Sequence, residues 1–137
     1  MNQPAPVQPL TVQEPAWRTR RIFVRDLVVP CLIGVHRHEK DGRQRVRINL
    51  DLDVAEDEAA HGDRLVNVVC YEEIISAIRR ITDAGHINLV ETLAERVADY
   101  CLGDPRVRMA RVRIEKLDVF ADAGSVGVEI ERANRAQ

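Results

Sequence analysis

One stretch of this chain, RVRINLDLDV at residues 45–54, alternates polar and apolar side chains without a break. Successive side chains of a β-strand point to opposite faces of the sheet, so the stretch predicts a strand with one buried face and one solvated face. The apolar positions are Val46, Ile48, Leu50, Leu52 and Val54. A strand of this kind requires other elements to cover its apolar side.

The rest of the chain supplies three further predicted strands and two predicted helices. The strand-like stretches are residues 21–35, 109–116 and 125–132. Helical periodicity covers residues 71–81, with Gly85 ending that helix, and a second stretch that begins after Asn88 and stops near Gly103. In the first strand, Pro30 predicts a bend or an exposed edge. The order ββααββ predicts an α+β fold, an antiparallel sheet with two helices on its apolar face.

Composition limits the classes of protein to which the chain can belong. Residues 1–19 hold four of the six prolines and no hydrophobic period, which predicts a disordered tail before a single folded domain at 20–137. Basic and acidic residues number 20 and 22, and no basic stripe carries aromatics, so we expect no nucleic-acid partner. No segment has the apolar length of a membrane span. The three cysteines sit in apolar runs, typical of buried free thiols, and the sequence predicts a cytoplasmic protein.

Glu91 stands three residues after Asn88, at the edge of the apolar stripe of the second predicted helix. It has two interpretations. In the first, Asn88 caps the helix and Glu91 completes a capping box by reaching back to a backbone N–H group. In the second, a carboxylate held ionised at the helix N-terminus, beside an apolar surface, binds the hydrogen-bond donors of a ligand. The helix pattern by itself leaves both open.

Lys116, Glu39 and Tyr71 are further candidates for functional residues. Lys116 ends a core-facing row and has two interpretations. In one, its aliphatic stem lies along the core while the ammonium reaches water. In the other, the ammonium is partly desolvated and exchanges its proton near neutral pH. Glu39 lies in a polar loop, as a solvated charge or as a functional side chain. Tyr71 opens the first helix, where it either packs against the protein or stacks on a planar ligand.

His36 and His38 form a His-x-His pattern that would place two imidazoles on one face of a strand and begin a zinc site. A third ligand would have to come from His61 or His86, far away in the sequence. Because the pattern is short and common by chance, the sequence predicts no metal.

Several stretches taken together resemble the dihydroneopterin aldolase family of folate biosynthesis. They are IGVHRHEKDGRQRVRINLDL, NVVCYEEI, INLVETLAERVA, and VRIEK followed by SVGVEIER, in the family's order between Arg21 and Arg132. The resemblance implies the tunnelling fold (T-fold), in which ββααββ subunits join their sheets into an oligomeric barrel. It further implies a homo-octamer of two stacked tetrameric rings with shared active sites. Free sheet edges that need covering fit this expectation.

The resemblance also implies a proton-transfer pair. Glu39, which lies five residues before Gln44, matches the family's loop glutamate. Lys116 matches the lysine that ends the third strand. We expect Lys116, tuned by Glu39, to manage proton transfer to and from the substrate ring.

The substrate-binding residues are implied in the same way. Glu91 matches the glutamate of the Asn-Leu-x-Glu motif that anchors the pterin, and backbone groups near Val90 are expected to assist. Tyr71, two residues after Val69, matches the tyrosine that enters a neighbouring subunit's pocket. Tyr71 is also expected to act in catalysis, by orienting the ligand and relaying a proton, and Val69 is expected to contact the substrate with it. A pterin presents a ring N–H and an adjacent amino group, and a carboxylate accepts both hydrogen bonds.

The implied reaction is retro-aldol cleavage of dihydroneopterin to hydroxymethyl-dihydropterin and glycolaldehyde. The imine of the dihydropterin accepts the electron pair, so no cofactor is expected. Leu117 departs from the commonest family pattern, which has proline there, and the run KLDVFADAGSV is closer to dihydroneopterin triphosphate epimerase. No added basic cluster is evident to hold a triphosphate.

We therefore expect an aldolase with epimerase side activity, and the epimerase is the alternative. Less favoured are a zinc-dependent enzyme resembling pyruvoyl-tetrahydropterin synthase, suggested by the two histidines, and a non-catalytic pterin-binding protein.

Overall fold

The structure, a computed structural model, describes most of the chain. The described residues are 18–36, 39, 42–56 and 61–134. Residues 1–17, within the predicted tail, lie outside this set. The elements in chain order are β1 (Arg18–Cys31), β2 (Gln44–Glu56), the 3-10 turn η2 (Leu65–Asn67), α1 (Tyr71–Asp83), α2 (Val90–Leu102), β3 (Val107–Lys116) and β4 (Val126–Ala133). Within these ranges, no helix is long and apolar enough to cross a membrane.

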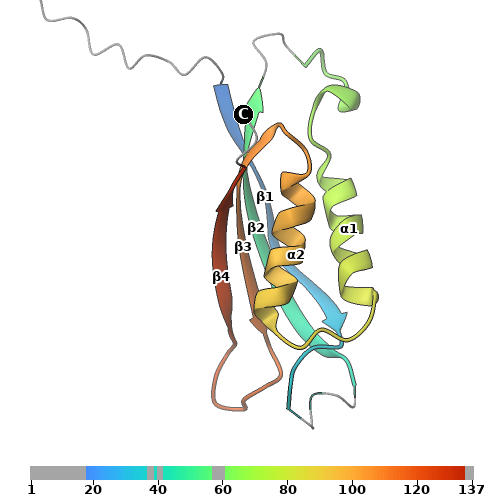
Figure 1. The fold of residues 1–137 in the computed structure, drawn as a ribbon, viewed down its shortest axis with the longest axis vertical. Coiled ribbons are helices and arrows are strands. Elements are labelled where there is room, and N and C mark those ends of the chain that lie inside the picture. Colours follow the sequence, from blue (N-terminus) through green and yellow to red (C-terminus); the bar gives the residue numbers. More distant parts are fainter. Residues whose placement is uncertain (1–17, 37–38, 40–41, 57–60, 135–137) are drawn as a thin grey trace, which may run out of the picture.

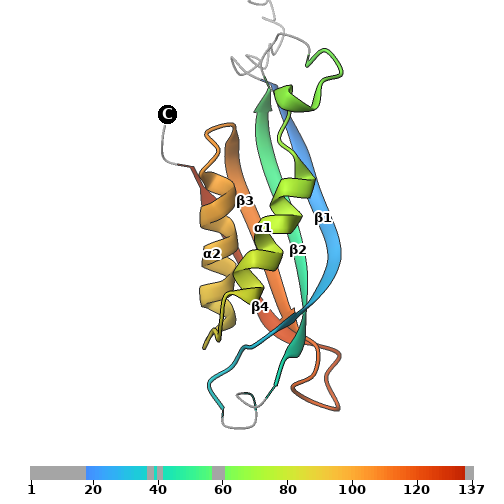
Figure 2. The same cartoon turned by 90° about the vertical axis from the view of Figure 1, so that its right-hand side faces the viewer.

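The four strands form one antiparallel sheet in the order β1-β2-β3-β4, and both helices cover the same face of it (Figures 1 and 2). The ββααββ order and the α+β class predicted from the sequence are confirmed for the subunit. Strands β1 and β4 form the two edges of this sheet. Such edges carry backbone groups that another strand can pair with.

The core lies between the sheet and the helices. The core-facing rows of β2 and β3 are fully buried, and their register pairs Ile48 with Ile114, Leu50 with Val112 and Leu52 with Ala110. The helices contribute Ile74, Ala77 and Ile78 from α1, and Leu93, Ala94, Val97, Ala98 and Cys101 from α2. Full burial of one such Leu or Ile side chain stabilises the fold by about 2 kcal/mol. If the pairing register slipped by one residue, a whole apolar row would be exposed. The core therefore fixes the register, and with it the residue that ends each core-facing row.

The bend in β1 lies at Asp26, not at Pro30. The register of β1 with β2 shifts between Val24 and Leu27, and Asp26 has a φ of 53°. Its backbone N–H donates to Asn49 Oδ1 at 2.9 Å, and aspartate is one of the residues that tolerate this left-handed conformation. Pro30 keeps its place in the strand, exposed on the sheet edge, which agrees with the alternative expectation.

The capping-box interpretation of Asn88 and Glu91 is wrong. Helix α2 begins at Val90, its N-cap is Leu89 with an extended backbone, and no side chain caps it. The cause is a tertiary contact, since Ile87 N–H donates to Leu32 O at 2.8 Å and Gly34 N–H donates to Ile87 O at 2.9 Å. This pairing holds the chain extended up to the helix, so Glu91 falls in the first turn without a capping role.

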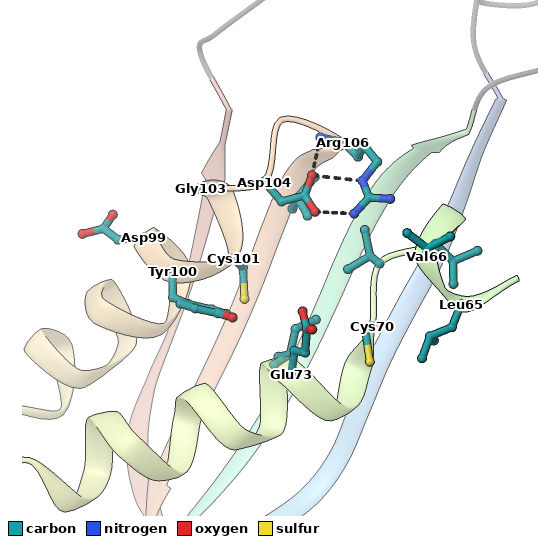
Figure 3. Close-up of a pocket in the computed structure, with 14 residues that line it drawn as sticks. Leu65, Val66, Cys70, Glu73, Asp99, Tyr100, Cys101, Gly103, Asp104 and Arg106 are labelled. Carbon is teal, nitrogen blue, oxygen red and sulfur yellow. Dashed lines mark hydrogen bonds and ion pairs between the residues drawn. The ribbon is translucent and has the colours of Figure 1, made fainter. Parts of the chain in front are cut away.

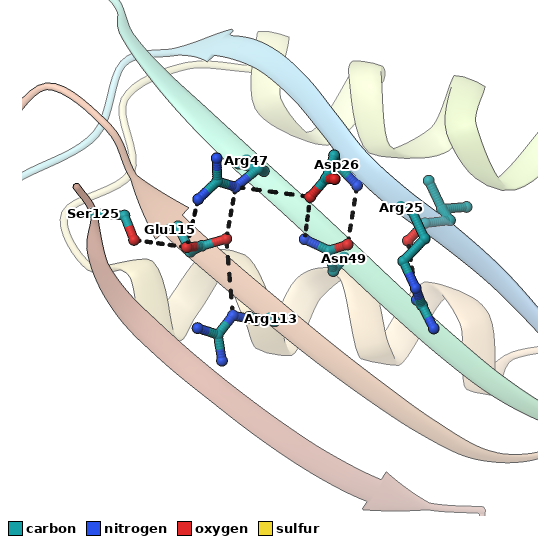
Figure 4. Close-up of polar contacts among 8 residues, drawn as sticks. Arg25, Asp26, Arg47, Asn49, Arg113, Glu115 and Ser125 are labelled. Carbon is teal, nitrogen blue, oxygen red and sulfur yellow. Dashed lines mark hydrogen bonds and ion pairs between the residues drawn. The ribbon is translucent and has the colours of Figure 1, made fainter.

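The other face of the sheet carries an ion-pair network (Figure 4). Arg47 donates two hydrogen bonds of 2.8 Å to the Glu115 carboxylate, and Ser125 Oγ donates a third at 2.6 Å. Arg113 Nε lies 3.8 Å from Glu115 Oε2. The hydrogen bonds from Arg47 lower the pKa of Glu115 to about 2, although burial opposes this shift. Because these charges satisfy one another, we interpret the network as structural.

Candidate active site

Glu39 and Lys116 form a buried ion pair across 77 residues of sequence. Lys116 Nζ donates to Glu39 Oε2 at 2.7 Å, and the two side chains are 15% and 2% exposed. Lys116 is the last residue of β3 and pairs with Val46, so its side chain continues a core-facing row. The contact of the ammonium with a buried carboxylate favours the second alternative, a partly desolvated lysine, over snorkelling. The family resemblance implied that these two residues act together, and the structure brings them together.

Gln44 is a member of this cluster that the sequence analysis did not count among the site residues. Its Nε2 donates to Glu39 Oε2 at 3.1 Å and to Ile33 O at 2.6 Å. A signal for it existed. Gln44 ends the core-facing row of β2 in the same way as Lys116 ends the row of β3, so both polar residues terminate adjacent apolar rows.

The surroundings of Glu39 hold it in the ionised form. Burial by itself raises the pKa of this carboxyl, but hydrogen bonds from Lys116 and Gln44, the charge of Lys116 and the His36 N–H together outweigh it and lower the pKa to about 2. Gly34 makes room for the carboxyl group, because a Cβ there would lie 2.3 Å from Glu39 Cδ, and its φ is +123°. A substitution at this glycine would displace Glu39.

The Glu39 pKa predicts an acid-sensitive contribution to stability. The folded-state pKa of about 2 lies below the ordinary value of 4.5, so the ion pair stabilises fully above pH 4.5 and its contribution is lost as the pH falls toward 2. We expect the difference in unfolding free energy between the wild type and Glu39→Gln to shrink over that range. Urea titrations between pH 2 and 7 measure it. A difference independent of pH would contradict the assignment.

The N-terminus of α2 lies at the same end of the molecule as this cluster (Figures 1 and 2). The Ile33–Ile87 bridge holds the segment that leads into α2 beside the segment that leads to Glu39. His86 Nε2 lies 2.7 Å from Gly34 O and adds a second link. Glu91 is exposed in the first helical turn, and no described residue pairs with its carboxylate. The ligand-anchor interpretation of Glu91 therefore remains, without a competing structural role.

Tyr71 and Val69 lie elsewhere in the subunit. Tyr71 opens α1 near the end of the sheet where β1 begins, and α1 runs from there towards the Glu39 end (Figure 2). A helix of 13 residues spans about 20 Å, so the two sets of residues sit far apart. Tyr71 is 60% exposed, whereas Val69 is buried.

Val69 lines an open groove of about 1040 Å³ between the start of α1 and the end of α2 (Figure 3). Exposed apolar side chains, Leu65, Val66 and Tyr100, lie along it. The groove does not include Glu39, Lys116 or Glu91.

The histidines and cysteines offer no metal-ligating or nucleophilic arrangement in the described ranges. No group of three His, Cys, Asp or Glu side chains there could hold a metal ion. His38 lies outside the described residues. Cys31 and Cys101 are buried free thiols, and burial raises the pKa of both, that of Cys101 to about 12. Cys70 is free and half-buried, which is more exposed than we expected.

In a comparison with known protein families, the model of the dihydroneopterin aldolase family matches residues 22–131, which is most of the described chain. The chain belongs to the dihydroneopterin aldolase family. The resemblance found in the sequence is thereby confirmed. The family includes epimerase members, and the chain resembles both kinds.

Two curated relatives illustrate this. Dihydroneopterin aldolase of Escherichia coli K12 is 28% identical over 113 residues, 82% of this chain and 93% of the relative. The dihydroneopterin triphosphate 2'-epimerase of Pseudomonas aeruginosa is 28% identical over 110 residues, 80% of this chain and 89% of the relative.

Two solved structures of the family share the fold. A dihydroneopterin aldolase from Burkholderia, bound to guanine, is 36% identical, covers 84% of this chain and 91% of its own, and superposes with a TM-score of 0.72. The E. coli dihydroneopterin aldolase in complex with neopterin is 28% identical, covers 83% and 99%, and gives a TM-score of 0.74.

Proposed function

We propose that this chain is a dihydroneopterin aldolase, which cleaves dihydroneopterin to hydroxymethyl-dihydropterin and glycolaldehyde. The observation that carries the proposal is the buried Glu39–Lys116 ion pair at the end of the subunit where α2 begins. Burying two charges costs more than burying apolar side chains of similar size, so stability alone is a weak reason for such a pair. The chemistry of the family offers another reason for burying the pair: a lysine that transfers protons needs a fixed counter-charge beside it.

Substrate binding is assigned to Glu91. Its carboxylate, in the first turn of α2, accepts hydrogen bonds from the ring N–H and the adjacent amino group of the pterin. Backbone groups near Val90 complete the contact. Guanine and neopterin, the ligands of the two solved relatives, both carry this donor pair, which supports the anchor.

Catalysis requires a base for the side-chain hydroxyl proton and a sink for the electron pair of the breaking carbon–carbon bond. The ring imine of dihydropterin is that sink, so Lys116 does not need to form a Schiff base. Lys116 exchanges a proton with the ring nitrogen through water. Glu39 stays a carboxylate throughout the neutral range and provides the counter-charge for the ammonium.

We further propose that the working form is a homo-octamer of two stacked tetrameric rings with active sites shared between subunits. The position of Tyr71 and Val69 supports this, because α1 begins at Tyr71, at the opposite end of the subunit from the end of β3, where Lys116 lies (Figure 2). In a ring, the same residues of a neighbouring subunit complete the pocket. The free edges of β1 and β4 are available for joining the sheets.

Subunit mixing tests the shared site. Lys116→Ala and Tyr71→Ala oligomers are each expected to be nearly inactive. Dissociated, mixed in equal amounts and reassembled, they should recover roughly a quarter of wild-type activity, because one site in four combines both intact residues. Each variant taken through the same cycle alone is the control. No recovery in reassembled mixtures would contradict sharing.

The reaction is tested by incubating the purified protein with dihydroneopterin and, separately, with its triphosphate, with and without chelator. Chromatography should resolve hydroxymethyl-dihydropterin and glycolaldehyde as the products from dihydroneopterin. The yield should be insensitive to chelator. Chelator-dependent turnover would move the assignment to a zinc enzyme, and no turnover of either compound would refute the enzymatic assignment.

The second candidate is the triphosphate epimerase. The run that follows Lys116, with Leu117 in place of proline, favours it, and so does the similarity to the P. aeruginosa epimerase. Epimerisation can proceed by the same cleavage followed by re-addition, so Lys116 and Glu39 would keep their roles. Isomerised triphosphate without cleavage products would select this candidate.

A further inference from the structure

The chain beyond Lys116 stays attached to β2 through three residues, Arg45, Leu117 and Asp118, which we call the strand-end clamp. Leu117 N–H donates to Arg45 O at 3.1 Å. Arg45 N–H donates to Asp118 Oδ2 at 2.9 Å. The Arg45 guanidinium reaches Asp118 Oδ1 from Nε at 3.2 Å and from Nη2 at 2.7 Å.

The clamp lies one step beyond the groups that hold Glu39. Gln44 immediately precedes Arg45, and Lys116 immediately precedes Leu117; both donate to Glu39 Oε2. Lys116 with Val46 is the last pair of the β2–β3 ladder before the chain leaves the sheet. The clamp therefore closes the ladder where the catalytic lysine projects.

We propose that the strand-end clamp is a positioning device that aims Lys116 and Gln44 at Glu39. The inference rests on the proposed function for its catalytic consequence, but its structural part stands on the contacts alone. Strand ends open locally at low cost, and an opened end would let the lysine move away from its carboxylate. Small displacements of a proton-transfer group reduce the rate strongly.

The contact between residues 45 and 117 constrains what residue 117 can be. Leu117 uses its backbone N–H, and proline has none, so the departure from the commonest family pattern coincides with a hydrogen bond that a proline could not make. In this chain the Leu117 N–H adds one hydrogen bond to β2 beyond the last ladder pair, and Asp118 follows with its contacts to Arg45.

An exposed Arg–Asp pair by itself contributes little to stability. The clamp differs because one carboxylate accepts hydrogen bonds from a backbone N–H and a guanidinium together. These contacts fix the position of the carboxylate relative to β2. The Arg45 side chain is 63% exposed and that of Asp118 36%. The hydrogen bond from the Arg45 side chain lowers the pKa of Asp118, so this carboxylate stays ionised at neutral pH.

Asp118→Ala and Asp118→Asn in the full chain test the proposal. Alanine removes every contact of the carboxylate, whereas asparagine keeps an oxygen for the Arg45 N–H. The matched control is Glu95→Ala, which removes a carboxylate from an exposed Arg132 pair that joins α2 to β4. The first readout is the Glu39 carboxyl pKa, measured by carbon NMR titration without substrate. The second is the separation of kcat from KM for dihydroneopterin.

For Asp118→Ala we expect the Glu39 pKa to rise by about one unit or more, because its partners withdraw, and kcat to fall roughly tenfold with KM nearly unchanged. Asp118→Asn should lie between this variant and the wild type. Glu95→Ala should change neither readout. An Asp118→Ala protein that matches Glu95→Ala in the Glu39 titration would overturn the proposal, whatever its activity. If the wild type turns over no pterin, the proposed function fails while the titration still decides on the clamp.

Discussion

Replacing Lys116 with alanine is expected to lower kcat for dihydroneopterin cleavage by about 10² to 10⁴, the usual contribution of a positioned acid–base group. Lys116 is the cation of the buried pair with Glu39 and ends the core-facing row of β3. The proposed pterin anchor, Glu91, is unchanged in this variant, so pterin affinity should stay within a few-fold of the wild type. Initial-rate assays measure kcat, and a titration followed by pterin fluorescence measures binding.

The variant leaves Glu39 buried without its cation, which destabilises a protein by about 3 to 5 kcal/mol and could unfold it. The double variant Lys116→Met with Glu39→Gln removes both charges and serves as the folded comparison. It should unfold near the wild-type temperature and still fail to cleave the substrate. A folded Lys116→Ala protein with more than about a tenth of wild-type kcat would contradict the role of the lysine.

Local periodicity accounts for the parts of the fold that could be predicted. The alternation in β2 fixed its two faces, and the same period placed Lys116 on the core side of β3. The interaction of Lys116 with Glu39 is a different kind of information, since 77 residues separate them and neither pattern encodes the contact. The family resemblance, not the periodicity, paired these two residues in advance.

Two local interpretations did not hold, the capping box at Asn88 and the bend at Pro30, whereas the exposed-edge alternative for Pro30 agrees with the structure. Both residues have strong local preferences. Pairing of Ile87 with the segment after β1 decided where α2 begins, and Asp26 took the bend in β1 through its bond with Asn49. In both places a contact between distant segments outweighed a propensity worth about 1 kcal/mol. The loss of the capping box is what leaves Glu91 available.

Replacing Glu91 with alanine should weaken pterin binding by about 100-fold or more, because two charge-assisted hydrogen bonds of a bidentate contact are lost. Glu91 is exposed and unpaired among the described residues, so its removal leaves no buried charge and the melting temperature should hardly change. Glu91→Gln should bind almost as poorly, since its amide presents a donor to one of the two pterin donors.

The control is Glu72→Ala. Glu72 is the second residue of α1 as Glu91 is the second residue of α2, and both are acidic groups in a first helical turn. The two variants therefore lose the same interaction with a helix N-terminus, and only Glu91→Ala loses the proposed anchor. Equilibrium titration with neopterin compares them. If Glu91→Ala binds within about threefold of Glu72→Ala, the anchor is wrong, because a bidentate charged contact cannot be that weak in a specific site.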